Sequence, residues 1–152
     1  MLKRQRTTLI AIIVLGFLVY VPNAIMWVRA ARIRDTASWE SQDQFVTIAF
    51  QGAFWTSVAV VLGYTLASPL FRWTEADSFR KQALIFPAIV GVFCLLEMYF
   101  GPAGILIYLL SKPFPPAPAG MLSSLVAMFI LSFVTAAGLR AVDRLTRSRL
   151  SN

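Results

Sequence analysis

The sequence predicts an all-α integral membrane protein, a single domain over residues 1–152 with four transmembrane helices and both termini in the cytoplasm. Hydrophobic residues make up 58% of the 152-residue chain and charged residues 14%, whereas soluble domains carry about 25% charged residues. Four apolar segments, approximately 8–28, 45–70, 83–110 and 121–139, each contain the run of about 20 residues that crosses a bilayer. These segments lack the alternation of barrel strands, so we expect a four-helix bundle.

Segment 8–28 follows a basic start and is longer than the apolar core of a secretory signal. We therefore expect a helix that is retained, with Pro22 and Asn23 interrupting it near its outer end. The charged stretch 29–44 then leads to the second segment, either as a short interfacial helix or as a solvated loop. In segment 45–70, Ala59, Gly63 and Ala67 are four residues apart, a spacing typical of closely packed membrane helices.

Segment 83–110 is too long for one straight span, because 28 helical residues measure about 42 Å and the hydrocarbon core about 30 Å. Glycine and proline in residues 101–104 predict a break. We favour one kinked helix; the alternative ends the helix near Phe100. The proline-rich stretch 112–120 is either a spacer or a docking strip for a partner.

After segment 121–139, apolar residues recur every third position in residues 140–152 with arginines between them. This pattern predicts an amphipathic cytoplasmic tail that lies on the membrane surface.

Lysine and arginine predict the orientation, because they remain near cytoplasmic helix ends. With four spans, one side holds ten of these residues and the other side holds four. The ten are Lys3, Arg4, Arg6, Arg72, Arg80, Lys81, Arg140, Arg144, Arg147 and Arg149, and the four are Arg29, Arg32, Arg34 and Lys112. We expect a multi-pass protein of the cell membrane with cytoplasmic N and C termini.

The net charge of +7 indicates contact with membrane lipids, including anionic headgroups at the cytoplasmic face. Nucleic acid is not an expected partner, because the basic residues are dispersed over several segments.

One carboxylate lies inside a predicted span. Glu97 is at a membrane depth, about 21 Å from the inner boundary, that helix rise also assigns to Asn23 and Gln51, with Tyr20 and Tyr99 within a turn. We expect these five residues to form a polar intramembrane cluster, and one hypothesis is that this cluster binds a ligand. The alternatives are a purely structural polar contact that sets helix register and a Glu97 placed near the outer headgroups.

The sequence offers few catalytic groups. It contains no histidine and one cysteine, Cys94, so it predicts no catalytic residue, no metal site and no cofactor. Whether the protein is an enzyme stays open, because a glutamate with tyrosine partners could shuttle a proton.

The end of the third segment carries a local motif. Residues 86–112, with Phe100, Gly101, Pro102, Gly104 and Tyr108, resemble the last helix of the ABA4-like membrane protein family. The chain departs from that family by continuing into a proline-rich stretch and a further helix. The resemblance implies a connection with isoprenoid or carotenoid molecules.

Two functional hypotheses follow. The first is a non-catalytic accessory subunit that packs with partner membrane proteins or a second copy of itself, or binds an apolar ligand such as a lipid or isoprenoid. The second is a small membrane enzyme or transporter that acts on an apolar, carotenoid-like molecule by means of Glu97.

Overall fold

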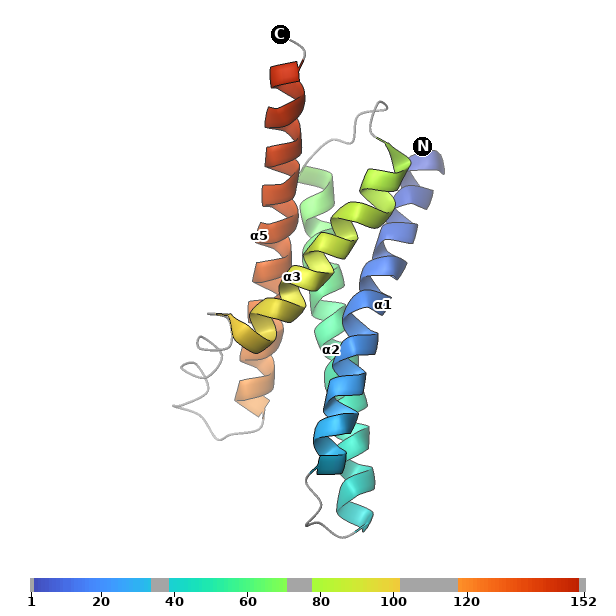
Figure 1. Ribbon diagram of the computed structural model, residues 1–152, viewed down its shortest axis with the longest axis vertical. Coiled ribbons are helices and arrows are strands. Elements are labelled where there is room, and N and C mark those ends of the chain that lie inside the picture. The colour runs from blue at the N-terminus through green and yellow to red at the C-terminus, as the bar shows by residue number, and fades with distance from the viewer. Residues whose placement is uncertain (1, 34–38, 71–77, 102–117, 151–152) are drawn as a thin grey trace.

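The computed structural model describes residues 2–33, 39–70, 78–101 and 118–150 (Figure 1). Its regular elements are the helices α1 (Leu2–Ile33), α2 (Trp39–Leu70), η1 (Lys81–Ile85, one turn of π-helix), α3 (Phe86–Phe100) and α5 (Pro118–Leu150). The predicted all-α fold is thus confirmed for the described residues.

Within the described residues, four helical stretches are long and apolar enough to cross a membrane. They are Arg4–Met26, Ala49–Pro69, Lys81–Phe100 and Leu122–Leu150. Large apolar side chains are exposed on all four, as a bilayer allows because it solvates apolar surface. The fold is therefore that of a multi-pass helical membrane protein.

The first two helices extend beyond the predicted spans. Residues 2–7, 29–33 and 39–44 are helical, and only residues 34–38 of the expected outer loop lie outside the described chain. Each helix has 32 residues, or about 48 Å, which exceeds the hydrocarbon thickness. The length of the apolar segment sets how much of a helix can lie in lipid, but it does not set the total length of the helix. Helix α1 also runs through Pro22, so the predicted interruption there is wrong; membrane helices tolerate proline where neighbouring helices support the backbone.

The third span starts with a wide turn and ends early. Pro87 has no N–H to donate to the carbonyl four residues before it, and in the preceding π-turn the N–H of Phe86 donates to the carbonyl of Lys81. At the other end, Gly101 is extended (φ −101°, ψ 178°) and donates its N–H to the carbonyl of Glu97 at 3.1 Å. Helix α3 ends at Phe100 and the extended Gly101 falls in the predicted break at 101–104, so whether the segment resumes as a helix after the break stays a prediction. Residues 102–117 lie outside the described chain.

Helix α5 continues without a break from Pro118 to Leu150. Residues 118–120 of the expected proline strap are its first turn, and residues 140–150 of the expected surface tail continue its axis. Figure 1 shows α5 rising past the other helices at the end of the bundle where both termini lie. A surface-lying tail requires a bend at the membrane boundary, and α5 contains none in these residues.

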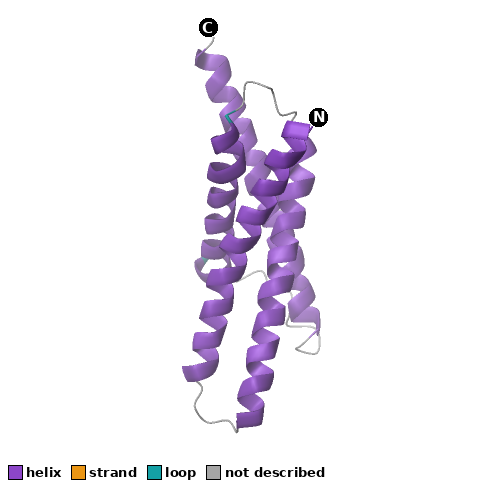
Figure 2. Cartoon of the chain, turned by 90° about the vertical axis from the view of Figure 1, so that its right-hand side faces the viewer, coloured by secondary structure: helices purple, strands orange, loops and turns teal. Residues whose placement is uncertain are grey.

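Helix α2 packs along both α1 and α5, while α3 crosses obliquely and contacts α1 and α5 (Figures 1 and 2). Buried apolar residues from all four spans form one core, with Leu15, Val60, Val90 and Met128 among its largest fully buried members.

The small residues of α2 let α5 approach closely. Ala59, Gly63 and Ala67 are all buried, as the spacing predicted. A Cβ on Gly63 would overlap the carbonyl oxygen of Phe129 and stand 3.0 Å from the Cβ of Ser132. The Ser132 hydroxyl donates to the carbonyl of Val60 at 2.6 Å.

We predict that Gly63→Ala destabilises the bundle by about 1–3 kcal/mol, because the added methyl group meets backbone that cannot rotate away. Thermal unfolding in a mild detergent measures the effect. Gly52→Ala is the matched control on the same helix, since its Cβ would meet nothing within 4 Å. Equal melting temperatures for the two variants would contradict the close approach of α2 and α5.

Candidate functional site

A hydrogen bond joins α1 to α3 in the half of the bundle away from the termini. The Tyr99 hydroxyl donates to Asn23 Oδ1 at 2.7 Å, and the Asn23 side chain is fully buried at 0% exposure. Helix packing sets this contact, because Gly91 lies against Leu15 and Leu18 of α1, and both helices run in the same direction from there (Figure 1). Asn23 and Tyr99 form the Asn–Tyr pair, the centre of the candidate site.

The amide nitrogen of Asn23 is not used by this pair. Asn23 Nδ2 is buried and has no hydrogen-bond partner among the described residues. A buried donor without an acceptor costs about 1–3 kcal/mol. The Asn–Tyr pair therefore presents two amide hydrogens that an oxygen atom of another molecule would satisfy.

Glu97 lies near this layer but leaves α3 in another direction. It is half-buried in the last turn, and its carboxylate folds back against Gly101. A Cβ at residue 101 would overlap that carboxylate and stand 2.8 Å from the Glu97 Cα. Two residues of helix correspond to about 200°, so Glu97 and Tyr99 project to nearly opposite sides of α3.

The other two residues of the predicted polar cluster, Tyr20 and Gln51, differ in their exposure. Tyr20 lies on α1 about one turn before Asn23 and is half-buried. Gln51 is exposed on the outer surface of α2, so its expected place inside the cluster is wrong. Helix rise assigns Gln51 the depth of Asn23, but Gln51 is exposed while Asn23 is buried.

A second polar group, missed in the sequence, lies toward the end that carries the termini. Arg140 is buried to 8% exposure, its guanidinium carbon 4.7 Å from the centre of the Phe86 ring. The same guanidinium interacts with the hydroxyl of Tyr64, which also donates to the carbonyl of Gln82 at 3.4 Å. The sequence did contain a signal: Arg140 follows Ser132 and Ala136 at four-residue spacing, and both are buried.

An ion-pair cluster lies on the same end of α5. Asp143 accepts from Lys81 Nζ at 3.1 Å and from Arg147 Nη2 at 2.8 Å. The first contact ties η1 to α5, and the second follows one turn along α5. Among the described residues, no group of three or more histidine, cysteine or acidic side chains could hold a metal ion.

These features define a multi-pass helical membrane protein whose described residues include a part-buried amide–phenol pair between two spans. Comparison with protein-family models, curated proteins and solved structures finds no match. The likeness to the ABA4-like family stays a prediction, and three of its residues, Pro102, Gly104 and Tyr108, lie outside the described chain.

We predict that Tyr99→Phe lowers the free energy of unfolding by about 0.5–1.5 kcal/mol, because the Asn23 oxygen loses its donor in a buried setting. Tyr20→Phe, which removes the same atom one turn away from Asn23, is the control. Chemical or thermal unfolding in detergent micelles compares the two. If both variants unfold as the wild type does, the Asn–Tyr hydrogen bond does not contribute to the free energy of unfolding.

Proposed function

We propose that this chain is a non-catalytic accessory protein of the cell membrane that binds one apolar, oxygen-bearing molecule at the Asn–Tyr pair. The observation that carries the proposal is the buried Asn23 Nδ2 without an acceptor among the described residues. A carbonyl or hydroxyl oxygen on a lipid or isoprenoid supplies that acceptor. One well-placed polar contact in an apolar setting is how proteins orient largely apolar ligands.

The surroundings of the pair support access from the bilayer. Phe100, next to Tyr99, is 86% exposed, and Ile25 and Met26 near Asn23 are also exposed on α1. A molecule dissolved in the hydrocarbon would reach the pair by local separation of α1 and α3 and would not cross water. The Tyr99 hydroxyl occupies Asn23 Oδ1, and the amide nitrogen has no partner among the described residues, so it is available to the entering oxygen.

One observation favours the alternative, an enzyme or transporter that acts on an apolar molecule. The Glu97 carboxylate lies half-buried at the end of α3, two residues from Tyr99. In this reading, Glu97 is the proton donor or the ligand contact for a molecule bound on its own side of α3, and the Asn–Tyr pair takes no part. Partner membrane proteins or a second copy of the chain would pack against the exposed apolar faces under either reading.

We expect the protein purified in mild detergent to carry close to one equivalent of an apolar, oxygen-containing compound, detected by solvent extraction and mass spectrometry. Asn23→Leu removes the amide and should release the compound. Gln51→Leu makes the same kind of change at the same depth on an exposed position, and should retain it. Tyr99→Phe should weaken retention while preserving the fold. Equal retention by Asn23→Leu and Gln51→Leu would remove the basis of the proposal.

Glu97→Gln separates the two readings in the same assay. A binding protein retains the same compound in the wild type and in Glu97→Gln. An enzyme yields a converted compound from the wild type and the unconverted compound from the variant.

We also propose that both termini are cytoplasmic, which the ten-to-four distribution of basic residues supports. Both termini lie at one end of the bundle (Figure 1). A fluorescent protein fused after Asn152 should fluoresce, and an alkaline phosphatase fused at the same point should be inactive, because the phosphatase requires export. Active phosphatase at this position would reverse the proposed orientation.

A further inference from the structure

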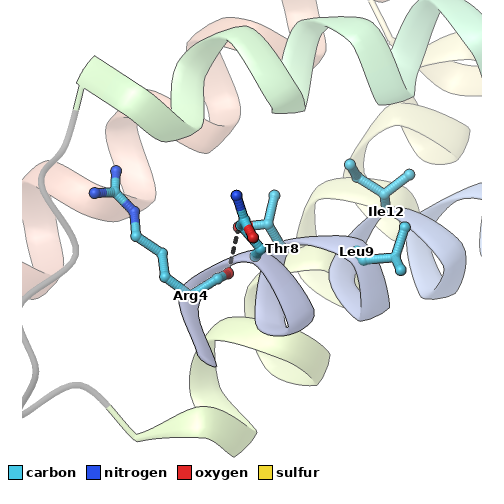
Figure 3. Close-up of a pocket in the computed structure, with 5 residues that line it drawn as sticks. Arg4, Thr8, Leu9 and Ile12 are labelled. Atoms are coloured by element: carbon cyan, nitrogen blue, oxygen red, sulfur yellow. Dashed lines mark hydrogen bonds between the residues drawn. The ribbon is translucent and has the colours of Figure 1, made fainter. Parts of the chain in front are cut away.

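A groove lies along the first turns of α1, away from the Asn–Tyr pair. Its volume is about 410 Å³. The described residues that line it are Arg4, Gln5, Thr8, Leu9 and Ile12 (Figure 3). The ligand proposed for the Asn–Tyr pair does not use this groove, but the inference about the groove rests on the proposed cytoplasmic orientation of the termini.

The lining changes from charged to apolar along the helix axis. Arg4, Thr8 and Ile12 follow one another at four-residue spacing, so they stack on one face of α1. About 12 Å of helix separates Arg4 from Ile12. The Thr8 hydroxyl donates to the carbonyl of Arg4 at 3.0 Å, one turn earlier in α1 (Figure 3).

Length and composition put the expected membrane boundary within the groove. The stretch that is long and apolar enough to cross a bilayer begins at Arg4, so we expect Arg4 and Gln5 at headgroup level and Ile12 in the hydrocarbon. Leu9 is 57% exposed and forms the apolar wall between them. A phospholipid has the same order along its length: phosphate, ester, then acyl chain.

The charge of this region favours an anion. Lys3, Arg4 and Arg6 lie within four residues, and the first acidic residue of the sequence is Asp35. No carboxylate on α1 therefore competes for the Arg4 guanidinium within the helix. Anionic lipids of the cytoplasmic leaflet attract basic segments placed at this level.

We propose that this groove binds one anionic phospholipid, with the phosphate on Arg4 and the upper part of one acyl chain along Leu9 and Ile12. The Gln5 amide donates to a phosphate or ester oxygen at the same level. The apolar wall decides in favour of a lipid over a free anion, because a phosphate ion gains nothing from Leu9 and Ile12. The single arginine distinguishes this site from the general attraction of the basic end.

Native mass spectrometry of the whole chain in detergent tests the site, with phosphatidylglycerol added in increasing amounts. We expect one phosphatidylglycerol to bind to the wild type and Arg4→Gln to bind it about tenfold more weakly, the loss of a charge-assisted contact. Arg6→Gln is the matched control: it removes the same charge from the same helix end, and Arg6 is exposed and does not line the groove.

Two further arms use the wild type. Phosphatidylcholine at equal concentration should bind more weakly, because its headgroup has no net charge. Glycerol phosphate, which lacks acyl chains, should not displace phosphatidylglycerol. Melting temperatures of lipid-free Arg4→Gln and Arg6→Gln establish that both variants are folded.

Each of three results overturns the proposal. Equal weakening in Arg4→Gln and Arg6→Gln means diffuse attraction by the basic end. Equal binding of the two lipids means that the headgroup charge is not recognised. Displacement by glycerol phosphate means a site for a free anion.

Discussion

Every backbone N–H and C=O inside a bilayer needs a partner within the protein, because hydrocarbon supplies none. The described chain meets this constraint with helices alone. Several hydroxyl side chains follow the same rule locally: Thr56, Ser57 and Thr65 each donate to the carbonyl four residues before it in α2. Against this background Asn23 stands out, since its amide nitrogen is buried without a partner among the described residues. That exception is why we place ligand binding between α1 and α3.

Contacts between helices carry more weight here than in a soluble bundle, because lipid removes the hydrophobic drive for one helix to join another. Several pairs of described helices are joined by a polar contact, and the residues that make this contact differ from pair to pair. Ser132 ties α5 to the backbone of α2, Tyr99 ties α3 to Asn23 of α1, and Tyr64 of α2 reaches the carbonyl of Gln82 in η1. The close approach at Gly63 supplies the van der Waals contact between α2 and α5.

The polar chemistry of the molecule is divided between two levels. At the end that carries the termini, cationic groups dominate: Arg140 is buried against Phe86, and Lys81 and Arg147 share Asp143. The half away from the termini holds, among the described residues, the Asn23 amide, the Tyr99 phenol and the Glu97 carboxylate. The first level suits the charged headgroups of lipids, and the second suits a single oxygen on an apolar molecule. The two proposed binding sites follow this division.

The sequence by itself determined the helical membrane class, the approximate place of the four spans and the packing stripe around Gly63, because apolar length and residue size are local properties. Apolar length did not predict the ends of the helices. Helices α1 and α2 continue through polar residues beyond their apolar segments, and α3 ends at Phe100. Tertiary structure alone decided which polar residues meet. Rise along a helix assigns Asn23, Gln51 and Glu97 to one depth, but each residue turns the side chain by about 100°. The rotation and crossing of the helices therefore bring Asn23 to Tyr99, direct Glu97 to the other side of α3 and leave Gln51 outside.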